Sequence, residues 1–115
     1  MSFGGANRLY PLLVHVQVER TGDAVWIVVS GEIDLATAED LKGVGLRALS
    51  DPACRSLTFD LSDVAFMDST GLGILVDLRN AARPEQSPIR LHHPSPRVLE
   101  VLKLTGMDTV FEIAR

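Results

Sequence analysis

The sequence contains only one cysteine, Cys54, so an internal disulfide is excluded and a reducing compartment is expected. Apolar runs such as Val25–Val29 are far shorter than the roughly 20 residues that a membrane-spanning helix requires. The N-terminus has no basic segment followed by a long apolar stretch and a small-residue cleavage site, as a secretory signal would. We therefore expect a cytoplasmic protein without a membrane segment.

Positive charge is also scarce. Lys42 and Lys103 are the only lysines, and the arginines are scattered from Arg8 to Arg115. The formal net charge is −4 and the sequence pI is about 5.2. Affinity for nucleic acid depends largely on cationic side chains that neutralise phosphates. The composition therefore predicts no direct binding to nucleic acid.

Hydrophobic residues are plentiful for a chain of this size. They make up 46% of the 115 residues, which is enough for one hydrophobic core, while the length is too short for a second domain. The charged share of 23% is typical of a soluble globular protein. We expect residues 1–13 to be a flexible lead-in and residues 14–115 to form a single domain.

A β-hairpin is predicted at the start of this domain. Residues 14–19 alternate apolar and polar side chains, which indicates a half-buried strand. The turn-forming segment 21–23 leads into the apolar, β-favouring run 24–29. We expect an antiparallel pair whose second strand is the more buried, with Trp26 in the core.

Helical and strand patterns alternate through the rest of the chain. Apolar residues at helical spacing predict a helix over 35–50, in which Gly43 and Gly45 indicate either close packing on the sheet or a local irregularity. The other expected segments are a strand at 57–61, a link at 62–67, a helix from 69 or 70 to 82, a turn at 84–88, a strand at 89–92, a helix at 95–104 with Pro96 at its start and Gly106 as its C-terminal cap, and a strand or short helix at 110–113. This order predicts an α/β fold with a mixed sheet of about four to five strands and about three to four α-helices.

The segment 66–73 carries the most informative chemistry. Asp68 is placed to cap the helix that follows, and Ser69 then takes the first helical position, where free N–H groups and the positive end of the helix dipole gather. Gly71 and Gly73 are expected to leave the backbone open to another molecule. A phosphate on Ser69 would be tolerated by this helix start, yet its charge of about −1.5 to −2, beside Asp68 and Asp34, would repel a partner. The same residues also describe an ordinary capped helix start.

Several catalytic and ligand motifs fail on one residue. An aspartic protease needs Gly directly after Asp68-Ser69, a hydrolase elbow needs Gly where Met67 stands, and a dinucleotide-binding loop needs Gly where Val76 stands. The candidate metal ligands lack the usual ligand spacing: His15, Cys54, His92 and His93. Cys54 has no base or cation motif around it and is expected to be an inert thiol. We expect no catalytic residue, cofactor or metal.

Five motifs in order resemble the STAS domain of anti-sigma factor antagonists. They are Gly31-Glu32-Ile33-Asp34 followed by Thr37-Ala38, Phe59-Asp60-Leu61, Phe66-Met67-Asp68-Ser69-Thr70-Gly71-Leu72-Gly73, Pro94-Ser95-Pro96-Arg97-Val98-Leu99 and Leu104-Thr105-Gly106-Met107. The resemblance covers residues 14 to 113, and the fold that it implies is a single STAS-like α/β domain.

The resemblance implies a binding protein that is switched by phosphorylation and is not an enzyme. Ser69 matches the family's phosphoacceptor, and Thr70 is a possible second acceptor. The implied partners are an anti-sigma factor that is itself a serine kinase with a histidine-kinase-like ATPase fold, and a phosphatase. The unphosphorylated form would bind the kinase and free a sigma factor. The implied partner-binding residues are Glu32, Asp34, Thr37, Asp68, Thr70, Gly71 and Leu72.

Other readings of the same sequence stay open. Glu32 and Asp34 fit either a partner contact or a solvated turn. The chain could be a constitutive STAS scaffold that binds partners, or itself, without phosphorylation. It could also be a nucleotide-binding sensor, because a glycine-containing helix start can hold a phosphate. Related STAS domains occur in sulphate transporters, but the lack of membrane segments argues against that branch.

Overall fold

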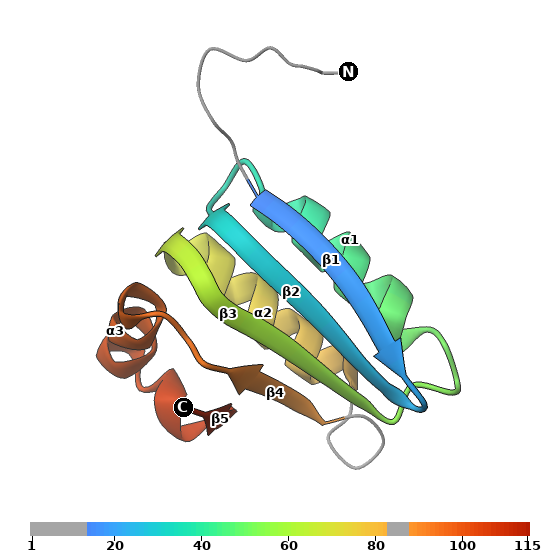
Figure 1. Ribbon diagram of the computed structural model, residues 1–115. Coiled ribbons are helices and arrows are strands. Elements are labelled where there is room, and N and C mark those ends of the chain that lie inside the picture. Colours follow the sequence, from blue (N-terminus) through green and yellow to red (C-terminus); the bar gives the residue numbers. More distant parts are fainter. Residues whose placement is uncertain (1–13, 83–87) are drawn as a thin grey trace.

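A five-stranded mixed sheet forms the centre of the fold in the computed structural model, which describes residues 14–82 and 88–115 (Figure 1). Its strands lie in chain order, β1-β2-β3-β4-β5; β1 pairs antiparallel with β2, and every later pair is parallel. The elements are β1 (Val14–Thr21), β2 (Ala24–Ile33), α1 (Ala38–Leu49), β3 (Ser56–Met67), α2 (Ser69–Ala82), β4 (Ile89–His92), α3 (Pro96–Thr105), the 3-10 helix η1 (Met107–Thr109) and β5 (Glu112–Ala114). The predicted α/β class and mixed sheet are confirmed.

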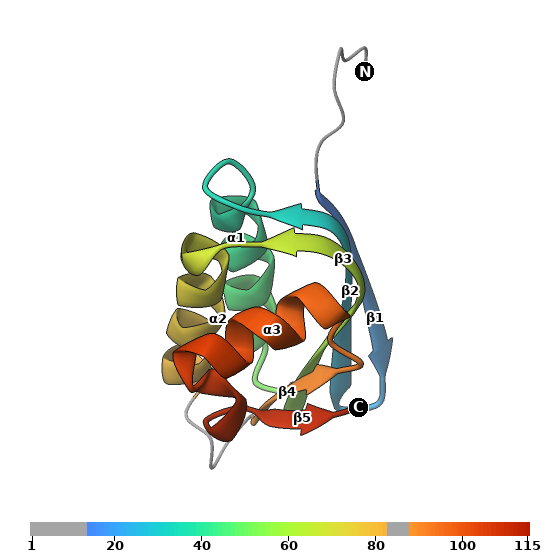
Figure 2. The ribbon, with the colours of Figure 1, turned by 90° about the vertical axis from the view of Figure 1, so that its left-hand side faces the viewer.

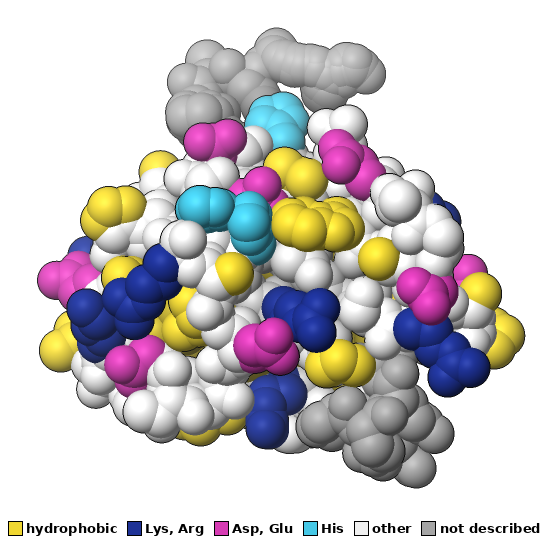
Figure 3. Space-filling view, turned by 60° about the horizontal axis from the view of Figure 1, so that its bottom comes forward, with side chains coloured by type: hydrophobic (Ala, Val, Ile, Leu, Met, Phe, Trp, Pro, Cys, Tyr) yellow, Lys and Arg dark blue, Asp and Glu magenta, His cyan; other side chains and the backbone are white. Residues whose placement is uncertain are grey.

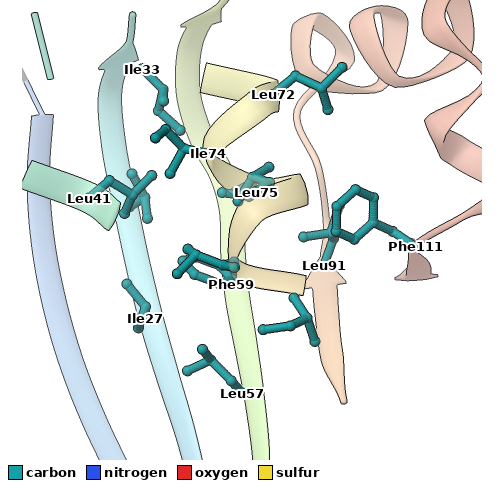
Figure 4. Packing of buried hydrophobic residues seen from close by; sticks show 14 of the residues in the cluster. Ile27, Ile33, Leu41, Leu57, Phe59, Leu72, Ile74, Leu75, Leu91 and Phe111 are labelled. Atoms are coloured by element: carbon teal, nitrogen blue, oxygen red, sulfur yellow. The ribbon is translucent and has the colours of Figure 1, made fainter. Parts of the chain in front are cut away.

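The helices lie on one side of the sheet (Figures 1 and 2). α1 and α2 cover one face, while α3 packs against β3 and lies beside α2 (Figures 1 and 2). No helix of the described ranges covers the opposite face (Figure 2). The core lies between the sheet and the helices, where inward side chains of the strands meet those of α1 and α2 (Figure 4). Its fully buried members include Ile27, Phe59, Leu91, Leu41 and Leu75.

The predicted hairpin is confirmed, but Trp26 does not lie in the core. Side chains alternate along β2, so Val25 and Ile27 face the helices and Trp26 faces the open side. There it is half-buried, with its ring 4.9 Å from that of His92 in an edge-to-face arrangement. Figure 3 shows histidine side chains next to hydrophobic ones, with charged side chains of both signs around them.

The third strand is longer than predicted. Residues 62–67 were expected to be a link, but β3 continues through them to Met67. The pairing of β2 with β3 shifts register between Val28 and Ser30, and again between Gly31 and Glu32. These irregularities let the two strands stay paired through residues 62–67.

The helix boundaries follow the predicted capping chemistry, except at the start of α1. That helix begins at Ala38, because residues 35–37 form a turn. Gly45 packs closely against helix α2 and not on the sheet, since a Cβ there would lie 2.7 Å from Leu78. At α3, Ser95 caps the N-terminus and Gly106 ends the helix with φ of 77°. In the predicted last segment, 110–113, the structure has the start of strand β5, and the short helix η1 precedes this segment. The lead-in 1–13 and most of the turn at 84–88 lie outside the described residues.

Candidate functional site

Two segments that are far apart in the sequence meet at the carboxyl ends of β2 and β3 (Figure 1). The last paired residues of these parallel strands are Ile33 and Met67, and an aspartate follows each of them. The backbone N–H of Asp68 donates to the carbonyl of Ile33 across 3.3 Å. Asp34 and Asp68 are therefore held at the same edge of the sheet.

Asp68 caps α2 as predicted. Its carboxylate accepts a hydrogen bond from the Gly71 N–H at 3.0 Å, and its carbonyl accepts from the Leu72 N–H at 3.0 Å. Ser69 is the first residue of the helix and is exposed, while Thr70 is half-buried. The cap thus presents the Ser69 hydroxyl to solvent at the positive end of the helix dipole.

We expect Asp68→Ala to lower the free energy of unfolding by about 0.5–2 kcal/mol, because the Gly71 N–H loses its acceptor. Asp68→Asn is the matched control, since its side-chain oxygen can accept the same bond and should retain most of the stability. Urea unfolding of the two variants and the wild type measures the difference. Equal stability of Asp68→Ala and wild type would contradict the capping role.

The turn between β2 and α1 is fixed by Asp34 and Thr37. One carboxylate oxygen of Asp34 accepts hydrogen bonds from the N–H groups of Ala36 and Thr37, at 3.0 and 3.2 Å. The hydroxyl of Thr37 donates to the carbonyl of Glu32 at 2.7 Å and accepts from the Asp34 N–H at 3.0 Å. Thr37 is only 8% exposed, so its side chain organises the turn from within. Sequence reasoning did not reveal this internal role.

Gly71 does not leave the backbone open to another molecule, as the sequence analysis had expected. A Cβ at this position would lie 2.7 Å from Cγ2 and 2.8 Å from the carbonyl oxygen of Ile33. Figure 4 shows Ile33 beside the first turn of α2. Gly71 therefore permits close contact between α2 and the end of β2. Gly73, by contrast, has nothing within 4 Å of a built Cβ and borders open space.

The predicted site residues differ in their access to a partner. The exposed ones are Glu32 and Ser69; the half-buried ones are Asp34, Asp68 and Thr70; and the buried ones are Thr37, Gly71 and Leu72. Among the residues that the structure describes, the carboxylates of Glu32, Asp34 and Asp68 form no salt bridge. The exposed part of the site is therefore a negatively charged surface around a serine hydroxyl.

Sequence reasoning missed two residues at this end of the sheet. Leu35 is 77% exposed in the turn after β2, whereas the sequence analysis placed it in a helix over 35–50. Phe66 pairs with Glu32 across the two strands, and the Arg97 guanidinium lies 5.1 Å from its ring centroid. Their signal in the sequence was their position beside the two aspartates. Leu35 and Phe66 add apolar groups to this surface, and Arg97 adds a cationic one.

The described residues also bear on metal binding and on membrane-spanning helices. Within 14–82 and 88–115, no group of three or more His, Cys, Asp or Glu side chains could hold a metal ion. The rings of His92 and His93 lie 4.0 Å apart and contact each other edge to face. Cys54 is buried. No helix in these same ranges is long and apolar enough to cross a membrane.

The chain matches one protein family model and several known proteins. A family model described as "Mlab, STAS domain" matches residues 16–113. An anti-sigma-B factor antagonist of Listeria monocytogenes is 37% identical over 95 residues, which are 83% of this chain and 82% of that protein. The corresponding antagonist of Bacillus subtilis is 28% identical over 101 residues, or 88% and 91% of the two chains. The crystal structure of an anti-sigma factor antagonist from Mycobacterium paratuberculosis has a TM-score of 0.81 at 29% identity, covering 89% of this chain and 86% of that one.

Proposed function

Because this chain belongs to the STAS-domain family of anti-sigma factor antagonists, we propose that it binds an anti-sigma factor through the surface around Ser69. The anti-sigma factor is itself a serine kinase, and its capture by the unphosphorylated chain releases a sigma factor in the cytoplasm. Phosphorylation of Ser69 by this kinase ends the binding, and a phosphatase restores it. The chain is a regulated binding protein and a substrate of the kinase.

The exposed hydroxyl of Ser69 at the start of α2 is the observation that carries this proposal. A kinase can reach it without unfolding the helix. A phosphate there adds about −1.5 to −2 charges beside a helix N-terminus, which favours an anion. The fold can therefore accept the modification.

The effect on a bound partner is opposite to the effect on the fold. The carboxylates of Glu32, Asp34 and Asp68 already make this surface negative. A partner that binds it must accommodate those charges, and an added phosphate occupies the volume in which the small hydroxyl was packed. A phosphate buried in the interface beside these carboxylates, without a cation of its own, costs several kcal/mol. One covalent change therefore prevents binding and leaves the structure intact.

Thr37, Gly71 and Leu72 support this surface from beneath, and the exposed and half-buried residues contact the partner. Thr70 follows Ser69 and is half-buried, whereas Ser69 is exposed. We therefore assign Ser69 as the main acceptor.

A phosphorylation assay tests the acceptor. The anti-sigma factor kinase of the native host is incubated with ATP and wild type, Ser69→Ala or Thr70→Ala, and incorporated phosphate is located by mass spectrometry. We expect wild type and Thr70→Ala to be labelled on residue 69 and Ser69→Ala to lose at least about nine-tenths of the labelling. Labelling of Ser69→Ala at the wild-type rate would show that Ser69 is only part of a helix start, and a scaffold independent of phosphorylation would replace the proposal.

A further inference from the structure

An exposed leucine lies in the turn between β2 and α1. Leu35 is 77% exposed, whereas Ile33, two residues before it, is completely buried. Leu35 and Ser69 each lie two residues beyond the paired strand residues Ile33 and Met67. The two residues therefore stand at the same end of the sheet, Leu35 in the turn after β2 and Ser69 at the start of α2.

The turn holds Leu35 in this exposed position. The carboxylate of Asp34 accepts from the N–H groups of Ala36 and Thr37, and the carbonyl of Asp34 accepts from Thr37 and Ala38 at 3.1 and 2.8 Å. The backbone is thus hydrogen-bonded directly before and after Leu35. The leucine cannot turn into the core without breaking these bonds, so it is presented to solvent at little cost in flexibility when a partner binds.

The surroundings of Leu35 indicate the chemistry of what covers it. An apolar side chain with charged groups around it matches the usual plan of a protein interface, in which a buried anchor is enclosed by a polar rim. The rim here carries the carboxylates of Glu32, Asp34 and Asp68, none of which forms a salt bridge within the described chain. A complementary surface therefore has an apolar pocket bordered by Lys or Arg side chains.

We propose that Leu35 is the apolar anchor of the complex with the anti-sigma factor and inserts into a pocket with a basic rim on that protein. This inference rests on the proposed function. It adds that affinity comes mainly from burial of Leu35, while Ser69 acts as the switch. The free energy gained by burying one leucine side chain is large enough to decide whether a complex of modest affinity forms.

Binding of the purified anti-sigma factor kinase to four variants tests this assignment. Titration calorimetry is carried out without ATP, so that Ser69 stays unmodified, on Leu35→Ala, Leu35→Met, Leu104→Ala and Ser69→Asp. Leu104 is the matched control because it is 81% exposed and lies on α3. We expect Leu35→Ala to raise Kd about 10- to 100-fold, and Leu35→Met and Leu104→Ala to change it less than about threefold. Melting temperatures should stay at the wild-type value for all three leucine variants.

The outcomes separate the anchor from the proposed function. If wild type binds and Ser69→Asp does not, but Leu35→Ala binds as wild type, the anchor is wrong and the switch stands. If wild type itself does not bind the kinase, the proposed function is wrong and the anchor falls with it. Size-exclusion chromatography tests whether a second copy of this chain covers Leu35. If wild type self-associates and Leu35→Ala is monomeric, Leu35 packs on a second copy and the proposal is overturned.

Discussion

Gly71→Ala should lower the free energy of unfolding by about 3 kcal/mol, although it adds only one methyl group. Its Cβ would lie 2.7 Å from Ile33 Cγ2, 2.8 Å from the Ile33 carbonyl oxygen and 2.9 Å from Met67 Cγ. A rotamer change of Ile33 or Met67 relieves two of these contacts, but the carbonyl belongs to the backbone of β2. The helix must therefore move away from the strand, which also weakens the bond between the Asp68 N–H and Ile33.

Gly73→Ala is the matched control for this prediction. Gly73 lies in the same helix, and a Cβ there meets nothing within 4 Å. Because alanine favours helix over glycine, this variant should be more stable than wild type, by up to about 1 kcal/mol. Urea unfolding of both variants measures the contrast. Similar free energies for the two alanine variants would show that the close contact at the start of α2 does not constrain the fold.

The two glycines also show how far sequence reasoning reaches. Gly71 and Gly73 stand in the same motif, and both were expected to expose the backbone. Only the contact with Ile33, 38 positions earlier in the chain, distinguishes them. The sequence predicted the Asp68 cap correctly because that bond is local, formed with a residue one turn away. It could not predict which face of the helix start meets the sheet.

The same division between local and tertiary information explains the fold. The hairpin and the caps of α3 follow from local patterns and were predicted correctly. Every residue of the run 24–29 is apolar, so alternation could not show that Trp26 faces away from the helices. Residues 62–67 were predicted to be a link, because a register shift that keeps two parallel strands paired leaves no local signal. Leu35 was likewise assigned to the predicted helix over 35–50, but residues 35–37 form a turn that Asp34 and Thr37 hold in place.

Ser69→Asp should weaken binding to the anti-sigma factor at least about 100-fold, the largest effect that we expect of any substitution. The new carboxylate joins those of Glu32, Asp34 and Asp68 on a surface that the partner must cover. Its effect on the fold is the opposite, because a negative charge in the first turn of a helix stabilises it by about 0.3–1 kcal/mol. The variant should therefore melt no lower than wild type while losing its partner. A phosphorylated chain, with more charge and more volume, should bind still more weakly.

Thr21→Asp separates the position of the charge from its amount. Thr21 is exposed and pairs with Ala24 at the first residue of β2, the opposite end of that strand from Asp34. Thr21→Asp changes the net charge as much as Ser69→Asp does, so an effect of net charge alone would change the affinity of both variants alike. We expect Thr21→Asp to bind within about threefold of wild type and Ser69→Ala to bind as wild type does. If Ser69→Asp binds as tightly as Thr21→Asp, negative charge at the start of α2 does not control the interface, and the domain binds its partners regardless of phosphorylation.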